Sequence, residues 1–206
     1  MAQVSAFDYQ EAFSRNIGWV TEEEQDTLRD KRIAIAGLGG VGGGHVLTLS
    51  RLGVTRFNLS DFDEFELPNF NRQAGATLSH LNRPKLDVLS EMARDINPET
   101  ECNLFPSGVN ASNMEQFLEG VDLYVDALDF FALEARRAVF KACSEKGIPA
   151  ITAAPLGMGV ALLCFMPGNM TFEEYFQRYS PPKFKFCFHF LILLGSYLHL
   201  GTELAR

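Results

Sequence analysis

The sequence predicts an α/β protein in which helices flank a mostly parallel sheet, with a short helical segment ahead of the first strand. Three observations lead to this class. An apolar strand at 32–36 runs into a G-x-G-x-x-G turn that opens a helix. A second strand follows that helix, and such a strand–helix–strand unit is a right-handed crossover between parallel strands. The same alternation recurs further along the chain, so the arrangement is Rossmann-like.

Composition and charge restrict the classes of function. The chain has 206 residues, 47% hydrophobic and 21% charged, which suits one well-buried α/β domain. Its net charge of -8 argues against general binding of nucleic acid or of an anionic membrane, because both attract a basic surface. The four cysteines include no C-x-x-C pair, so no zinc is expected. With no signal peptide at the N-terminus, we expect free thiols and a cytoplasmic protein.

Both ends of the chain have helical character. Thr21, with Glu24 three residues later, predicts that a helix begins there, since the pair can form a capping box. The C-terminal run FCFHFLILLGSYLHL is shorter than the roughly 20 residues of a membrane span. A buried or interface helix is therefore preferred to a membrane anchor.

The glycine turn predicts a nucleotide-phosphate site. Of Gly37, Gly39 and Gly42, one permits the tight turn, one lets phosphate approach the backbone, and one lets helix and strand pack closely. The helix at 42–51 presents free N–H groups and a partial positive charge to an anion. Gly53 is expected to terminate it.

An acid follows the second strand, which is predicted at 56–60. The ribose diol of a nucleotide is usually held at this place. Asp61 is preferred over Asp63 for that contact, and a structural role in the turn is the alternative for Asp63.

A polar loop comes next and holds Asn69, Asn71, Arg72 and Gln73. Such a group is unusual for a dehydrogenase, which needs few charges beyond the pyrophosphate. Arg72 carries a planar donor fork suited to phosphate oxygens. A solvated surface arginine is an equally good interpretation of it.

Lys85 stands at the start of an amphipathic helix that the spacing of apolar residues predicts up to Asn97-Pro98. Pro84 is expected at its first position, which puts Lys85 in the first turn. A positive charge is unfavourable there, beside the free N–H groups. A bound phosphate would compensate, so the placement hints at function.

Later strands are predicted at 101–105, 122–128, 150–153 and 160–165, and a short helix at 113–120. Asp126 and Asp129 stand at the carboxyl end of the strand at 122–128, where ligands collect in open α/β sheets. Asp129 is therefore a candidate ligand of Mg²⁺, which takes one or two carboxylates plus phosphates. It is also a candidate cap for a helix at 130–146, and the two roles are compatible.

Taken together, these motifs resemble the ThiF/MoeB/HesA family, the bacterial relatives of ubiquitin-activating enzymes. The resemblance covers roughly residues 12–170, and the order and spacing of the motifs also match. They are GLGGVG, the DFD at 61–63, the N-x-x-R-Q of Asn69, Arg72 and Gln73, Lys85 in RPKLDVL, and Asp129 in VDALD.

The resemblance implies ATP binding and ATP- and Mg²⁺-dependent adenylation of a carboxylate. By the resemblance, Arg72 and Lys85 bind the triphosphate, Asp129 binds Mg²⁺, and Arg15 reaches the γ-phosphate in the partner subunit of a homodimer. The substrate would be the C-terminus of a ubiquitin-like or sulfur-carrier protein. The implied nucleotide-binding residues are Gly37, Gly39, Gly40, Gly42, Asp61, Asp63, Asn69, Arg72, Gln73, Lys85, Leu128 and Asp129. The expected segments are an N-terminal helical part at 1–30, the adenylation domain at 31–170 and a C-terminal helical part at 171–206.

The sequence also departs from the family. Its zinc-binding cysteine pairs are absent, no catalytic cysteine is clearly matched, and the final strands are not recognisable, so a truncated or divergent member is expected. Relatives that activate a carboxylate on RNA gain no support from the acidic charge. Two alternatives stay open. One is a non-catalytic nucleotide-binding subunit or scaffold, and the other is an NAD-dependent oxidoreductase, which explains neither Arg72 nor Lys85.

Overall fold

A computed structural model describes residues 7–156 and 158–179. The chain divides into two compact units, one ending at Leu128 and the other beginning at Asp129, and each is described by itself. The elements of the first unit are α1 Tyr9–Phe13, η1 Ser14–Asn16, α2 Glu22–Asp30, β1 Arg32–Ala36, α3 Gly42–Arg51, β2 Arg56–Ser60, η2 Leu67–Asn69, η3 Leu78–His80, α4 Lys85–Ile96, β3 Glu101–Phe105, α5 Met114–Phe117 and β4 Leu123–Asp126. Those of the second are α6 Leu133–Lys146, β5 Ala150–Leu156, β6 Gly159–Phe165 and α7 Phe172–Tyr179.

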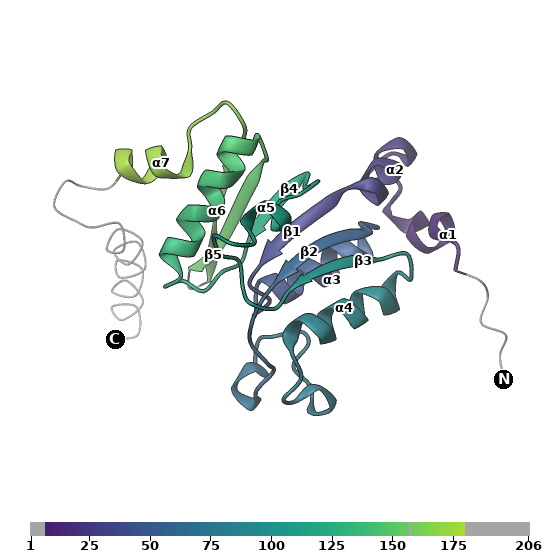
Figure 1. Ribbon diagram of the computed structural model, residues 1–206. Helices are drawn as coiled ribbons and strands as arrows, with labels where there is room; N and C mark the ends of the chain where they lie inside the picture. The colour runs from purple at the N-terminus through teal and green to yellow at the C-terminus, as the bar shows by residue number, and fades with distance from the viewer. Residues whose placement is uncertain (1–6, 157, 180–206) are drawn as a thin grey trace, which may run out of the picture. The chain divides into compact units, whose positions relative to one another are not determined.

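The first unit is built on a parallel sheet in the order β3-β2-β1-β4 (Figure 1). The central strand β1 is buried from Ile33 to Ala36, as a strand covered on both faces should be. All strands of this sheet therefore end at one edge, where the glycine turn follows β1 and Asp61 follows β2. The predicted α/β class, with helices beside a mostly parallel sheet, is confirmed.

Different helices cover the two faces of this sheet. On one face, Phe117 of α5 packs edge-on against Phe105 of β3 and lies near Tyr124 of β4, and its carbonyl accepts a hydrogen bond from Asn58 Nδ2 at 2.7 Å. Since side chains alternate along a strand, Phe57 of β2 points to the opposite face. Helices α3 and α4 pack against each other and against β1 and β3.

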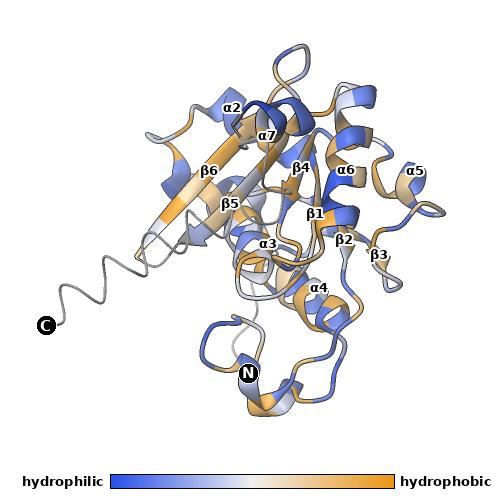
Figure 2. Cartoon of the chain, turned by 90° about the vertical axis from the view of Figure 1, so that its left-hand side faces the viewer, coloured by the Kyte–Doolittle hydropathy of each residue, from blue (hydrophilic) through white to orange (hydrophobic). Residues whose placement is uncertain are grey.

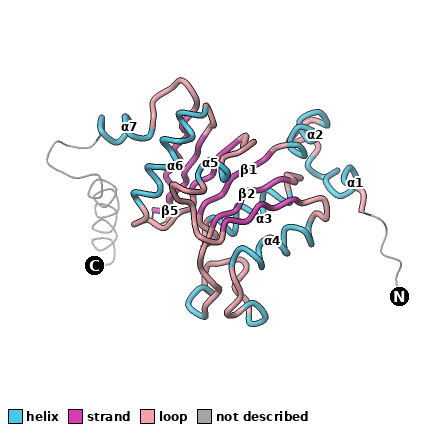
Figure 3. The backbone as a smooth tube through the Cα atoms, viewed as in Figure 1, coloured by secondary structure: helices cyan, strands magenta, loops and turns pink. Residues whose placement is uncertain are grey.

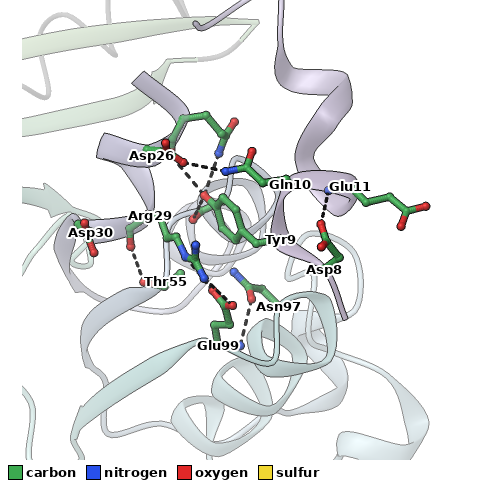
Figure 4. A network of polar contacts seen from close by, with 12 residues as sticks. Asp8, Tyr9, Gln10, Glu11, Asp26, Arg29, Asp30, Thr55, Asn97 and Glu99 are labelled. Atoms are coloured by element: carbon green, nitrogen blue, oxygen red, sulfur yellow. Dashed lines mark hydrogen bonds and ion pairs between the residues drawn. The ribbon is translucent and has the colours of Figure 1, made fainter. Parts of the chain in front are cut away.

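The N-terminal helices are fixed to the sheet by a buried polar cluster around Tyr9 (Figure 4). Tyr9 Oη donates to the carbonyl of Gly53 at 2.8 Å and accepts from Gln25 Nε2 at 2.9 Å. A Cβ on Gly53 would lie 2.3 Å from both groups, so only glycine fits after α3. The Arg29 guanidinium stacks 4.5 Å above the Tyr9 ring and forms a bidentate ion pair with Glu99. The predicted capping box of Thr21 and Glu24 is present at the start of α2.

The second unit consists of α6, the antiparallel pair β5–β6 and α7. Strand β6 is largely apolar (Figure 2). Aromatic rings of three elements form its core: Phe140 stacks on Phe172 at 4.4 Å between ring centroids, and Phe165 lies 5.3 Å from Phe140. Phe172 and Phe176 are buried, so α7 packs into this core through its aromatic face.

One expectation about this unit is wrong, and a second concerns residues that the structure does not describe. Asp129 does not cap a helix at 130–146, because α6 begins only at Leu133 with Ala132 as its cap. Instead, Asp129 Oδ1 accepts the N–H of Phe131 at 3.0 Å and closes a local turn. The predicted apolar helix within FCFHFLILLGSYLHL lies outside the described residues. Within the described ranges, no helix is long and apolar enough to cross a membrane.

Candidate functional site

The glycine turn is held in place by very close backbone contacts. Gly37 has φ +87°, and a Cβ there would lie 2.2 Å from the Ala127 carbonyl oxygen and 3.0 Å from Leu128 Cα. A Cβ on Gly42 would lie 1.8 Å from the Gly37 carbonyl oxygen. Both positions therefore require glycine, as the motif predicts. Leu128 is thereby brought beside the turn at the end of β4.

The turn leaves several backbone donors available where α3 begins. Val41, the residue at the cap of α3, provides no side-chain hydrogen bond to the helix. The N–H groups of Gly39, Gly40 and Val41 donate no hydrogen bond to any part of the chain that the structure describes. Unpaired N–H groups at a helix N-terminus, where the helix dipole is positive, form an anion-binding site.

Asp61 closes one side of the turn. Its Oδ2 accepts the N–H of Leu38 at 2.6 Å, and its Oδ1 accepts the N–H of Asp63 at 2.7 Å. The carboxylate is half-buried and keeps lone pairs free beyond these two bonds. Asp61 thus both orients the glycine turn and presents an acceptor next to it.

Lys85 is a buried lysine paired with Asp63. Its side chain is 6% exposed, and Nζ lies 2.8 Å from Asp63 Oδ2. Its backbone N–H also donates to the Asp63 carbonyl at 3.0 Å. Pro84 is the cap of α4 rather than its first residue, so Lys85 begins the helix. From the sequence, a bound phosphate was expected to offset the positive charge of Lys85. In the structure the carboxylate of Asp63 offsets this charge.

The loop between β2 and α4 contains the short turns η2 and η3 (Figure 3). It brings two polar motif residues close to the glycine turn. A Cβ on Gly40 would lie 3.4 Å from Arg72 Cγ, and one on Gly39 would lie 3.8 Å from Gln73 Nε2. The carbonyl of Asn69 accepts the N–H groups of Arg72 and Gln73, at 3.2 and 2.9 Å, and so folds them back. Asn69 therefore acts here through its backbone, and its Oδ1 accepts from Glu66 N–H.

Arg72 and Gln73 both retain unused polar groups. Arg72 is exposed, and its Nη1 donates to the Pro68 carbonyl and to Asn71 Oδ1. Its Nη2 and Nε donate nothing to other described residues. Gln73 is 8% exposed, and its buried Oε1 has no partner in the described chain. The guanidinium is thus available to an anion beside Gly40.

Arg15 is not brought to this site. Its neighbour Asn16 donates to the carbonyl of Arg51, at the C-terminal end of α3. The glycine turn lies at the other end of this 10-residue helix, about 15 Å away along its axis. Arg15 itself is exposed and makes no hydrogen bond or ion pair within the described chain.

Asp129 is exposed and is the first residue of the second unit, directly after Leu128 in the chain. Of its carboxylate oxygens only Oδ1 is engaged within the described residues, in the turn to Phe131. No group of three or more His, Cys, Asp or Glu side chains that could hold a metal occurs in the described ranges. A magnesium ion bound mainly through phosphates needs no such group.

The described cysteines show no activated thiol. Burial raises the pKa of Cys102 to about 11 and that of Cys143 to about 12, so both are protonated at neutral pH. Cys164 is exposed, and all three are free. Cys187 lies outside the described residues.

An open cleft of about 810 Å³ lies beside β3, and its lining includes Arg32, Asn103 and Ser107. No residue of the glycine turn lines this cleft.

The family model of the ThiF family matches residues 13–190. Among curated proteins, the chain is 35% identical over 142 residues to the tRNA threonylcarbamoyladenosine dehydratase of Bacillus subtilis, which covers 68% of this chain and 55% of that protein. It is 29% identical to the sulfur carrier protein ThiS adenylyltransferase of Escherichia coli, over 69% of this chain and 56% of that protein. The chain thus spans a little over half the length of these relatives.

A solved structure is also similar. The E. coli tRNA N6-threonylcarbamoyladenosine dehydratase in complex with ATP superposes with a TM-score of 0.69 at 26% identity. The similarity covers 77% of this chain and 65% of that one.

Proposed function

Because this chain belongs to the ThiF family, we propose that it binds ATP and uses it to adenylate a carboxylate. The observation that carries the proposal is the glycine turn with its unpaired N–H groups, set between Asp61, Arg72 and Leu128. A carboxylate that attacks the α-phosphorus adds negative charge to an already anionic centre. Positioning and cationic stabilisation then account for catalysis, without a protein acid or base.

In this proposal the residues of the first unit bind the nucleotide. The N–H groups from Gly39 to Val41 receive a phosphate, with Gly37 and Gly42 allowing its approach. Asp61 accepts the ribose hydroxyls, and Asp63 supports the site through Lys85. The remaining contacts are assigned to Asn69, Gln73 and Leu128.

Two cations stabilise the leaving pyrophosphate. The free edge of the Arg72 guanidinium offers Nη2 and Nε to phosphate oxygens. Lys85 lies with its ammonium group on Asp63, and we propose that it moves from this carboxylate to the phosphates when nucleotide binds. Asp129 holds Mg²⁺, which would neutralise charge on the phosphates.

Arg15 acts in the second subunit of a homodimer. Its distance from the glycine turn of its own chain and its unpaired, exposed guanidinium support this assignment. For the functional segments we propose the division expected from the sequence, with the adenylation domain at 31–170. A cytoplasmic location is supported by the three free cysteines of the described chain.

Two kinds of carboxylate are candidates as the substrate. The similarity to the ThiS adenylyltransferase favours the C-terminus of a ubiquitin-like or sulfur-carrier protein. The similarity to tRNA threonylcarbamoyladenosine dehydratases favours a carboxylate carried on RNA. The acidic net charge of the chain gave no support to such a substrate. We retain the carrier protein as the first candidate, because the net charge of -8 opposes a polyanionic substrate.

Exchange of radioactive pyrophosphate into ATP tests the proposal. We expect exchange with Mg²⁺ and the correct carboxylate, tested with carrier-protein C-termini and with tRNA in parallel. Arg72→Ala and Asp129→Ala should each lower the rate at least about tenfold. Full exchange by both variants would refute the assigned roles. ATP binding without exchange, restored by a second chain, would favour the non-catalytic subunit.

A further inference from the structure

Arg136 reaches back from helix α6 to the turn that carries Asp129. Its Nη2 donates a hydrogen bond to the Asp129 carbonyl at 3.2 Å, and its Nη1 donates one to the Phe130 carbonyl at 3.3 Å. Two nitrogens of one guanidinium thus hold two consecutive carbonyls. This pair of contacts needs a planar fork of donors, which arginine has and lysine lacks.

The turn itself is shaped by local hydrogen bonds and is largely exposed. Asp129 accepts the N–H of Phe131 at Oδ1 and the N–H of Ala132 at its carbonyl, both at 3.0 Å. Ala132 is also the cap of α6 and offers the helix no side-chain hydrogen bond. Asp129 is exposed, and Phe131 is 74% exposed, so burial of these two side chains does not anchor the turn. Arg136 connects it instead to a 14-residue helix.

The neighbouring arginine on α6 makes different contacts. Arg137 forms a bidentate ion pair with Glu173 of α7, in which Nε lies 2.6 Å from Oε1 and Nη2 lies 3.1 Å from Oε2. Successive residues of a helix point about 100° apart, so the two arginines leave α6 in different directions. Arg137 thus ties α6 to α7, whereas Arg136 ties α6 to the turn before it.

We propose that Arg136 is a positioning residue for Asp129, which holds the turn so that the carboxylate is set in place for Mg²⁺. The inference rests on the proposed function and deepens it. Because Oδ1 of Asp129 is engaged with Phe131, Oδ2 is the oxygen presented to the cation. A ligand that is fixed beforehand loses less conformational freedom when the metal binds than a mobile one does. Arg136 acts only through the backbone of the turn.

Calorimetry of ATP binding, with Mg²⁺ and separately with EDTA, tests the inference. We expect Arg136→Ala to weaken binding of ATP with Mg²⁺ about tenfold and to leave binding in EDTA unchanged. Arg136→Lys should lose nearly as much, because it keeps the charge but not the fork. Arg137→Ala is the matched control and should lose affinity in neither condition. Urea unfolding checks that each variant is folded, and Arg136→Lys carries the test if Arg136→Ala does not fold.

A double-mutant cycle shows whether Arg136 acts through Asp129. In an Asp129→Ala background, Arg136→Ala should cause no further loss of affinity for ATP with Mg²⁺. A second loss of the same size would overturn the inference, because Arg136 would then act independently of the carboxylate.

The remaining outcomes separate this inference from the proposed function. If Asp129→Ala loses the affinity gained from Mg²⁺ and Arg136→Ala keeps it, the positioning role is refuted while the proposed function stands. Equal losses with Mg²⁺ and in EDTA, or an equal loss in Arg137→Ala, also refute it, because the effect would then be structural. If the wild type binds no ATP, the proposed function fails and the inference fails with it.

Discussion

At the scale of single residues, the Asp63–Lys85 ion pair links the acids after β2 to the first residue of α4. Lys85 is almost fully buried, whereas the Asp63 side chain is 53% exposed. Removing the carboxylate leaves a buried ammonium without its charged partner, which is costly. We expect Asp63→Asn to lower the free energy of unfolding by about 1–2 kcal/mol, less than for a fully buried pair because water reaches Asp63.

Urea unfolding of a double-mutant cycle isolates this interaction. In a Lys85→Met background, which keeps the buried stem but removes the charge, Asp63→Asn should have almost no effect. Equal losses from Asp63→Asn in both backgrounds would mean that the pair contributes nothing to stability.

The cysteines give a second residue-scale prediction. Since burial raises the pKa of Cys102 to about 11 and of Cys143 to about 12, fewer than about one in a hundred of either thiol is ionised at pH 8. Iodoacetamide at that pH should label exposed Cys164 in the native protein, and leave Cys102 and Cys143 unmodified until the chain is unfolded. Peptide mapping by mass spectrometry measures this. Rapid labelling of Cys143 in the native state would contradict the described burial.

At the scale of elements, the glycine turn and helix α3 pack together as one structural unit. Gly42 and Gly44 lie in the same first turn of the helix but in opposite environments. A Cβ on Gly42 would clash with the Gly37 carbonyl, whereas one on Gly44 would meet nothing within 4 Å.

This contrast predicts opposite effects of the same substitution. Gly42→Ala should destabilise the fold by at least about 2 kcal/mol and abolish nucleotide binding. Gly44→Ala should stabilise it by about 0.5–1 kcal/mol, because alanine is the better helix former. Urea unfolding of both variants provides the measurement, and similar stability changes would contradict the packing described for the turn.

The sequence predicted these elements well where the signal is local. Strand β1, helix α3 and strand β2 begin and end where the apolar runs and glycines indicate. The cap predicted at Asp129 was wrong, because Asp129 bonds locally to Phe131 and the helix starts only at Leu133. Aspartate favours turns as much as caps, so its identity alone could not decide.

The candidate site was predicted less completely, because its geometry depends on contacts between distant segments. The hydrogen bond from Leu38 to Asp61 and the ion pair of Lys85 with Asp63 both span more than twenty positions in the chain. The side chain of Phe62 is 78% exposed, and this exposure was missed for another reason. A phenylalanine after an apolar strand ordinarily indicates core, and only its placement between two acids is a signal to the contrary.

At the scale of the whole molecule, the proposal requires two copies of the chain, because Arg15 lies beyond reach of its own glycine turn. Arg15→Ala and Lys85→Ala should each abolish pyrophosphate exchange. When the two variants are co-expressed, about half of the dimers are mixed, and each mixed dimer has one intact site out of two. About a quarter of the wild-type rate should therefore return. No recovery from verified mixed dimers, or a monomer by light scattering, would remove Arg15 from the site.

The central claim is that the glycine turn and the charges around it bind ATP rather than a dinucleotide. Calorimetric titration of the purified chain with ATP and Mg²⁺, and separately with NAD, tests it most directly. We expect ATP to bind and NAD to bind at least about tenfold more weakly, because Arg72 and Lys85 favour a triphosphate. Tight binding of NAD with no binding of ATP would contradict the account and restore the oxidoreductase alternative.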